Sequence, residues 1–169
     1  MEPDKASLVS SMESYFGSDS KRIAHAHKVT EYAERLMGPE GGDPSVVVAA
    51  GIFHDIGIPN AEKKYGSAIG KYQELEGPPV ARDILNRLGV PAAQIDEVCE
   101  IIAHHHSPGK ITTQNFKILY DADWLVNLRD EFDIRDRTKL ATIIDRVFLT
   151  ATGKALAKQI YLDSAASNS

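Results

Sequence analysis

The feature that most constrains the fold is an almost wholly apolar run, residues 45–53, which ends directly in the polar pair His54 and Asp55. Before it, Asp43 and Pro44 are typical of an N-cap and a first helical position. Three consecutive valines favour a strand, but the run continues through small residues for more than ten positions between helix signals, which favours a buried helix. A helix without a polar face must be buried, so this pair is expected in or beside the core.

Helical patterning continues along the chain. Apolar residues spaced by three and four in 21–37 and 116–128 suit one face of a helix. Helices are expected to end at Gly38–Pro39 and at Gly57, and to begin at prolines. The further helices predicted on this basis are 81–88 after Pro78 or Pro79, 92–106 after Pro91, 138–149, and a shorter one at 154–162 after the turn at Gly153. Residues 60–76 are expected to form a loop with a short helix, and the tail after Asp163 to be frayed.

These patterns predict an all-α fold of about six to eight helices in a single compact domain over residues 1–169. The motif-bearing core is expected at 21–128 and C-terminal helices at 133–163. The composition is 43% hydrophobic and 25% charged, which is ordinary for a globular protein. A chain of 169 residues is long enough to bury one sizeable core.

Composition also excludes several functions. The only cysteine, Cys99, cannot form an internal disulfide or a thiolate-rich metal site, so any metal must take nitrogen and oxygen ligands. Residues 1–11 lack a basic stretch before an apolar run, and no segment approaches the ~20 apolar residues that span a bilayer, so a cytoplasmic protein without membrane contact is expected. The net charge of −5 argues against long nucleic acid as a partner, whereas a small phosphorylated substrate needs only local cations.

All six histidines fall in three places, at 25 and 27, at 54, and at 104–106. A His-Asp pair alone is more often an exposed helix end. Burying a neutral polar group without a partner, however, costs ~2 to 7 kcal/mol, and an ion costs far more. A divalent cation satisfies such groups, and bundles assemble metal sites from side chains on several helices. Imidazole and carboxylate suit Fe, Mn, Ni, Co or Zn, so one or two such ions are expected.

Four motifs in this order resemble the HD superfamily of metal-dependent phosphohydrolases. They are Arg-Ile-Ala-His at 22–25, Gly-Ile-Phe-His-Asp-Ile-Gly at 51–57, Ile-Ile-Ala-His-His-His at 101–106 and Asp-Ala-Asp-Trp-Leu at 121–125. The resemblance implies a helical HD domain whose basic site has the ligands His25, His54, Asp55 and Asp123. Within it, His25 fits the family spacing better than His27, and Asp121 is expected to orient a ligand from outside the site.

HD proteins with two metals have further ligands between the His-Asp pair and the final aspartate. The resemblance offers His105 and His106 for this role, with His104 as a flanking residue. It also offers Glu76, which stands where such proteins commonly have a histidine. This departure leaves a binuclear site open, because glutamate can also ligate metals.

The resemblance implies a phosphohydrolase that cleaves a small, nucleotide-like phosphoester with a metal-activated water. Asp55 is expected to orient that water. Arg22, Lys63 and Lys64 are the catalytic candidates for stabilising phosphate charge, although single lysines are more often solvated surface groups. Tyr65, Tyr72 and Trp124 could stack a base.

Two other functions remain open on the sequence. One is a regulatory module that binds metal or nucleotide without turnover, which the unusual Glu76 keeps open. The other is a di-iron oxygenase of the HD type. Whether the chain forms a homodimer is also open.

Overall fold

The computed structural model describes residues 2–163, which contain helices and no strand, and the predicted all-α fold is confirmed. The expected fraying after Asp163 concerns residues 164–169, which lie outside the described part. The elements in chain order are α1 (Lys5–Phe16), α2 (Ser20–Glu40), α3 (Pro44–Phe53), α4 (Ile58–Tyr65), α5 (Gly70–Arg87), α6 (Ala92–His104), α7 (Gln114–Glu131), α8 (Arg137–Val147), α9 (Ala151–Lys158) and the π-helical turn η1 (Gln159–Asp163).

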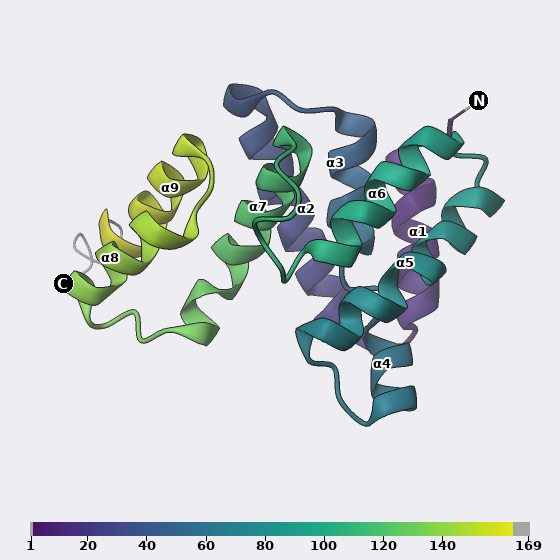
Figure 1. Cartoon of the computed structure of the whole chain (residues 1–169), viewed down its shortest axis with the longest axis horizontal. Coiled ribbons are helices and arrows are strands. Elements are labelled where there is room, and N and C mark those ends of the chain that lie inside the picture. The colour runs from purple at the N-terminus through teal and green to yellow at the C-terminus, as the bar shows by residue number, and fades with distance from the viewer. Residues whose placement is uncertain (1, 164–169) are drawn as a thin grey trace.

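Helix α3 is the centre of the core. It starts as the sequence predicts, with Pro44 in its first turn and the Asp43 carboxylate accepting a hydrogen bond from the Ser45 N–H at 2.9 Å. Seven of its ten residues are buried. It packs against α1, α2, α6 and α7, which surround it in Figure 1. The end of α3 therefore lies where several helices meet, and His54 follows there directly.

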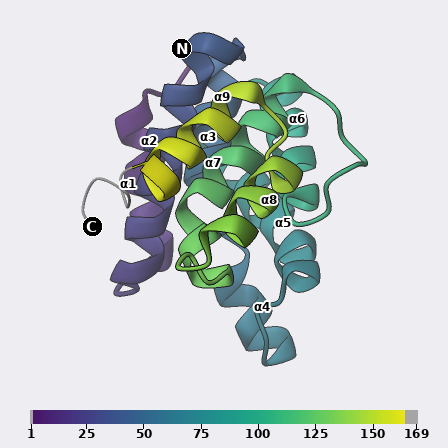
Figure 2. The same cartoon turned by 90° about the vertical axis from the view of Figure 1, so that its left-hand side faces the viewer.

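Helices α8 and α9 lie together beside α7, away from α1 and α5 (Figures 1 and 2). Two carboxylates, one on α2 and one on α7, accept hydrogen bonds from the start of α9 and from the connection between α8 and α9. Glu40, at the end of α2, accepts hydrogen bonds from the backbone N–H and hydroxyl of Thr152 at 3.0 and 2.6 Å. Asp121 in α7 accepts hydrogen bonds from the backbone N–H groups of Leu149 and Thr150 at 2.9 and 2.8 Å. The C-terminal helices are thereby fixed to the same two helices, α2 and α7, that carry motif residues.

Prolines end fewer helices than the sequence suggests. Helix α2 continues through Pro39 to Glu40 and stops at Gly41, whose φ of 78° is in the left-handed region. Pro39 lies in the last turn and has no N–H to donate to the preceding turn, yet the helix continues for one more residue. Pro78 and Pro79 lie inside α5, which begins eight residues earlier at Gly70. A proline inside a helix costs about 3 kcal/mol, and the packing of α5 along α6 offsets that cost.

The segment 60–76 is more regular than expected, because α4 and the first part of α5 occupy most of it. Nor does Gly57 end the helix before it, since α3 stops at Phe53 and Gly57 precedes α4. A Cβ placed on Gly57 would lie 2.4 Å from the backbone nitrogen of Gly77 in α5. Glycine is therefore required there by close contact between two backbones.

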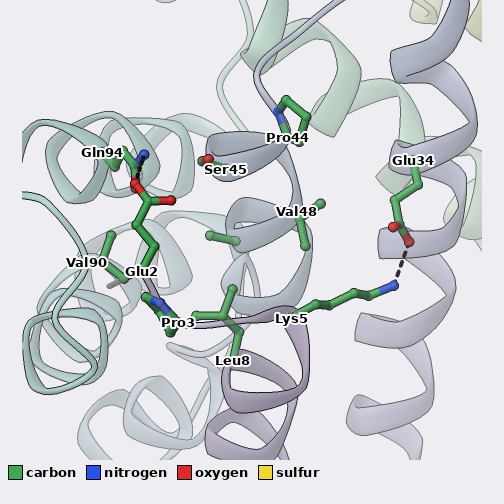
Figure 3. Close-up of a pocket in the computed structure, with 11 residues that line it drawn as sticks. Glu2, Pro3, Lys5, Leu8, Glu34, Pro44, Ser45, Val48, Val90 and Gln94 are labelled. Carbon is green, nitrogen blue, oxygen red and sulfur yellow. Dashed lines mark hydrogen bonds and ion pairs between the residues drawn. The ribbon is translucent and has the colours of Figure 1, made fainter.

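Helix α1 was not predicted from the sequence. Its N-cap, Asp4, accepts a hydrogen bond from the Ser7 N–H, and Lys5 forms an ion pair of 2.7 Å with Glu34 of α2. Figure 3 shows this ion pair at the edge of a surface pocket of about 280 Å³, where Gln94 also donates to Glu2. None of the residues that line this pocket belongs to the predicted site.

Among the described residues, no helix is long and apolar enough to cross a membrane.

Candidate metal centre

Three parts of the chain bring the predicted ligands of the basic site together at the end of α3. His54 and Asp55 lie in the turn between α3 and α4. His25 is in α2 and Asp123 is in α7, the two helices that pair with each other and with α3. Residues almost one hundred positions apart therefore meet, because α2 and α7 run beside the helix that ends in the His-Asp pair.

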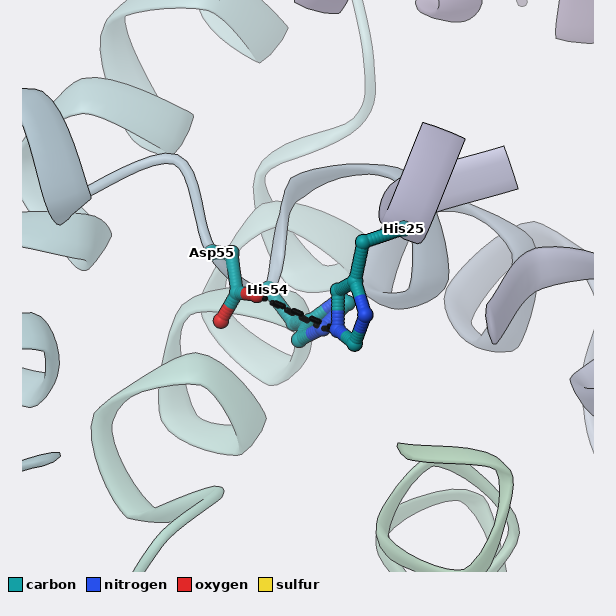
Figure 4. Close-up of side chains that lie close together, drawn as sticks. All are labelled: His25, His54 and Asp55. Carbon is teal, nitrogen blue, oxygen red and sulfur yellow. Dashed lines mark hydrogen bonds and ion pairs between the residues drawn. The ribbon is translucent and has the colours of Figure 1, made fainter. Parts of the chain in front are cut away.

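The atoms of this first donor group, which consists of His25, His54, Asp55 and Asp123, are within contact distance of one another. The Nε2 atom of His25 is 3.1 Å from Asp123 Oδ1, 3.3 Å from Asp55 Oδ2 and 3.3 Å from His54 Nε2. The Nε2 atom of His54 is 3.4 Å from each of the same two carboxylates. In Figure 4, the side chain of His25, from α2, points toward those of His54 and Asp55, from the turn after α3.

A second donor group lies on the other side of Asp55. Asp55, His105 and His106 have ligand atoms within 4.8 Å of one another, as do His25, His54 and Asp55. His105 Nε2 is 3.4 Å from Asp55 Oδ1, while Asp55 Oδ2 faces the first group. The two carboxylate oxygens of Asp55 thus serve different groups, which is the arrangement of a residue able to bridge two ions.

Hydrogen bonds fix the tautomers of the two most buried histidines. The Nδ1 atoms of His54 and His105 lie 2.8 and 2.7 Å from the main-chain oxygens of Gly51 and Ile102. A carbonyl oxygen only accepts, so Nδ1 carries the proton and Nε2 of a neutral ring keeps its lone pair. His105 Nε2 is buried without a hydrogen-bond partner among the described residues. Such an orphaned lone pair suits a metal ligand.

The separations within the first group fit metal coordination. With metal–ligand distances of about 2.1 Å, neighbouring ligand atoms are about 3.0 Å apart in an octahedron and about 3.4 Å apart in a tetrahedron. The separations of 3.1 to 3.4 Å span this range. Two imidazole nitrogens facing each other at 3.3 Å also gain more from a shared cation than from each other. The donor set therefore fits a divalent transition metal.

The charges of the site shift its pKa values strongly. Burial alone would lower the pKa of His54, but the carboxylates of Asp55 and Asp123 outweigh it and raise the pKa well above its ordinary value. Burial opposes ionisation of both carboxyls, yet His54 and its neighbouring histidines hold the pKa of Asp55 and of Asp123 below the ordinary range. The carboxylates are therefore ionised at neutral pH, and a proton on His54 competes with metal.

The pKa of His106 shifts in the opposite direction from that of His54. Burial of its ring, reinforced by the adjacent His105, lowers the pKa of His106 to about 4. The two rings lie with centroids 4.0 Å apart. His106 is therefore neutral at neutral pH, as a metal ligand must be.

Two adjoining cavities, here called the site cleft, open over the donor groups. One, of about 260 Å³, is lined by His25, Asp55 and Asp123 together with Lys21 and Arg22. The other, of about 180 Å³, is lined by His105 and Asp123 together with Tyr120 and Trp124. The residues that line both cavities are His106, Asp123, Asn127 and Glu131. One cavity thus adds two cations and the carboxylates of Asp130 and Glu131 to the donors, and the other adds two aromatic rings.

Three predicted site residues lie elsewhere. Neither Lys63 nor Lys64 lines the site cleft. Lys64 instead forms an ion pair of 2.9 Å with Glu76, whose other oxygen accepts a hydrogen bond from the Tyr65 hydroxyl at 3.2 Å. Glu76 belongs to neither donor group. Because its carboxylate is occupied by a cation of its own, this arrangement gives no support to Glu76 as a metal ligand.

The flanking residues also separate from the site. His27 faces Glu13 at 3.4 Å, and His104 Nδ1 donates to the main-chain oxygen of Glu100 at 3.0 Å. Asp121 anchors the connection between α8 and α9 rather than orienting a ligand, contrary to the expectation from the sequence. Burial raises the pKa of Asp121 to about 6, although its hydrogen bonds oppose the shift.

Lys21 and Asn127 are among the cleft residues that were missed in the sequence, and helical spacing could have found both. Lys21 is four positions before His25, so the two share a face of α2. Asn127 is four positions after Asp123 on α7, and its side-chain amide donates to Asp123 Oδ1 at 2.9 Å. Residues four apart from a ligand on the same helix are thus natural members of the site.

Comparison with known proteins agrees with this geometry. The model of the HD domain matches residues 22–147. A crystal structure described as a predicted HD superfamily hydrolase, from an uncultured Thermotogales bacterium, superposes with a TM-score of 0.70 and 25% sequence identity, over 94% of this chain and 86% of the other. No curated protein sequence matches the chain. HD domains bind divalent metals, and the matched range contains every member of the two donor groups. The chain therefore belongs to the HD-domain family, a family of metal-dependent hydrolases.

Proposed function

We propose that the protein is a metal-dependent phosphohydrolase that cleaves a phosphoester of a small, nucleotide-like molecule. The observation that carries this proposal is that donor residues line both cavities of the cleft, one together with Lys21 and Arg22 and the other together with Trp124. A phosphoryl group needs a centre of positive charge and a source of activated water. An organic substituent needs a complementary surface beside them, and the cleft offers all three.

Each side chain has a distinct task in this reaction. A divalent metal bound here acts as a Lewis acid and lowers the pKa of water. Asp55, which faces both donor groups, would orient the attacking water. Lys21 and Arg22 would neutralise nonbridging phosphate oxygens, whose charge grows in the transition state. Arg22 is also held by Glu62 of α4 at 2.7 Å, which restrains its guanidinium at the rim.

The other side of the cleft supports a flat organic group. Trp124 is half-buried and directly follows Asp123, so its indole is close to the donors. One face of the indole is supported by Phe132, with ring centroids 5.7 Å apart. An aromatic wall suits a nucleobase, which stacks on such rings. Tyr65 and Tyr72, by contrast, stack on each other with centroids 4.2 Å apart and line neither cavity of the cleft.

The test is a phosphomonoester and phosphodiester screen on metal-free protein with Mn²⁺, Co²⁺, Ni²⁺, Fe²⁺ or Zn²⁺ added back. We expect release of phosphate or of a nucleoside monophosphate that chelator abolishes and metal restores. His54→Ala should abolish it, whereas His27→Ala, a matched histidine outside the donor groups, should leave it intact. Full activity in the chelated protein, or tight nucleotide binding without turnover, would refute hydrolysis as the function.

A further inference from the structure

Each of three histidines in the donor groups has one ring nitrogen against a carbonyl oxygen. For His54 and His105 that oxygen belongs to the main chain three residues earlier. For His106 it belongs to a side chain of another helix, because Nε2 is 2.9 Å from Oε1 of Gln73 in α5. This oxygen can only accept, so His106 Nε2 carries the proton and Nδ1 keeps the lone pair.

The first turns of α5 surround His106 in other ways as well. Glu74 accepts hydrogen bonds from the His106 backbone N–H at 3.1 Å and from the Ser107 hydroxyl at 2.8 Å. Gly70 lies so close that a Cβ on it would be 2.9 Å from the Cβ of His106. Backbone, ring and next residue are thus all held by one segment of α5, although His106 itself follows α6.

We propose that Gln73 is a positioning residue for the second donor group. It holds His106 as the Nε2–H tautomer and so reserves Nδ1 for a metal ion. The proposal rests on the metal centre of the proposed function and adds a determinant of its second ion. Outer hydrogen-bond partners of ligating histidines fix ring orientation and raise ligand basicity, and losing one typically weakens metal binding by about 10- to 100-fold.

Of the three carbonyl oxygens that hold these histidines, two belong to the main chain and one belongs to a side chain. Substitution cannot remove the main-chain oxygens that hold His54 and His105. Gln73 is a side chain, so one residue of α5 sets the affinity of the second group without altering the first. The proposal therefore predicts two binding steps that respond separately to a change in α5.

The experiment is a titration of metal-free protein with Co²⁺. Calorimetry and the visible absorption of the bound ion measure each binding step. Wild-type protein is expected to bind two ions per chain in a tighter and a weaker step. Gln73→Ala should weaken the weaker step about 10- to 100-fold and leave the tighter step unchanged. Gln73→Glu keeps an oxygen acceptor and should restore the weaker step. The matched control is Gln94→Ala, since Gln94 bonds Glu2 far from the site, and it should titrate like wild type.

Gly70→Ala provides a second variant, because its methyl group displaces the His106 ring without removing Gln73. It should weaken the same step. The proposal is overturned if the wild type binds a single ion, or if Gln73→Ala binds the second ion as tightly as wild type. No hydrolysis is measured here, so a positive result together with an inactive protein would refute the proposed function and leave this inference standing.

Discussion

The first and second donor groups share Asp55 but are built differently. The first takes His25, His54 and Asp123 from α2, the end of α3 and α7, and its His54 side chain is 0% exposed. The second takes two adjacent histidines at the end of α6. Its outer member, His106, is exposed to solvent and has its Nε2 against the side-chain oxygen of Gln73 in α5.

This difference shows that one fold can prepare two donor groups to different degrees. The core packing of three helices already brings the donors of the first group together, so binding an ion there orders little. The second group is formed by one turn after α6, and His106 in this turn is hydrogen-bonded to Gln73 and Glu74 of α5. Since preorganised ligands bind more tightly, we expect the first group to hold the tighter ion.

The largest effect should follow from removing the shared residue. Asp55→Ala takes a donor from both groups, so both binding steps should be lost and turnover should fall by about 1000-fold or more, since a catalytic metal contributes several kcal/mol. Titration calorimetry and a kinetic assay measure the two effects. Asp83→Ala, which removes an exposed aspartate paired with Arg87, is the control. A tight ion retained by Asp55→Ala would contradict its shared role.

A smaller change should separate the groups. His54→Ala should weaken binding of the tighter ion, and His105→Ala should weaken binding of only the weaker ion. In each case we expect the affinity to fall by about 100-fold or more. Elemental analysis after dialysis gives the number of ions that remain per chain. His104→Ala should keep both ions. Equal losses in His54→Ala and His105→Ala would show that the two groups bind as one unit.

The cationic side of the cleft should affect substrate more than metal. Lys21→Ala removes a charge that lines the cleft and should raise KM about fivefold, because a partly solvated charged contact contributes about 1 kcal/mol. Metal content should not change. Lys63→Ala is the matched control, and steady-state kinetics distinguish the two. If Lys63→Ala raised KM equally, the cleft would extend beyond the residues that line it here.

The smallest effect concerns pH and the stability of metal-free protein. The raised pKa of His54 stabilises the fold below its ordinary value of 6.5, and this stability is lost as pH rises through the raised pKa. The lowered pKa of Asp55 stabilises the fold above its ordinary value of 3.8 and is lost as pH falls through the lowered pKa. Together, His54 and Asp55 favour a stability window between about pH 4 and 6.5 for metal-free protein. Within it, the lowered pKa of His106, about 4, favours the upper end, and the raised pKa of Asp121, about 6, favours the lower end.

Metal should reverse the upper part of this profile, because the ion displaces the proton from His54 and binds better as pH rises. Thermal unfolding from pH 5 to 8, with chelator and with Zn²⁺, measures both trends. In a chain of this size each 1 kcal/mol corresponds to roughly 2–4 °C in Tm. Parallel profiles with and without metal would show that His54 does not exchange a proton for the ion.

The sequence predicts the central helix well, because its signals are local. Asp43 and Pro44 mark the start of α3, and the apolar run dictates its burial. Pro39, Pro78 and Pro79 mislead, because whether a proline ends a helix depends on packing against other helices, which sequence does not display. α1 was missed for a similar reason, since its main contacts are with α2 and α3.

The site divides in the same way. The histidines and aspartates that meet in the two donor groups could be predicted, because their order and spacing in the sequence are specific. Lys63 and Lys64 were expected in the site because residues 60–76 were interpreted as an irregular loop beside it. Instead, α4 directs Lys64 toward Glu76, and Lys21 is the lysine that lines the site cleft. The partner of a surface cation depends on the helix that carries it, so composition alone cannot choose among lysines.

The contact of Gly57 with Gly77 joins two main chains just two residues after Asp55. Because neither residue has a side chain, no rotamer change can absorb a shift between the turn and α5. A movement of α5 would therefore pass almost undiminished to the carboxylate between the two donor groups. The distance between the two donor groups is thus mechanically linked to the position of α5.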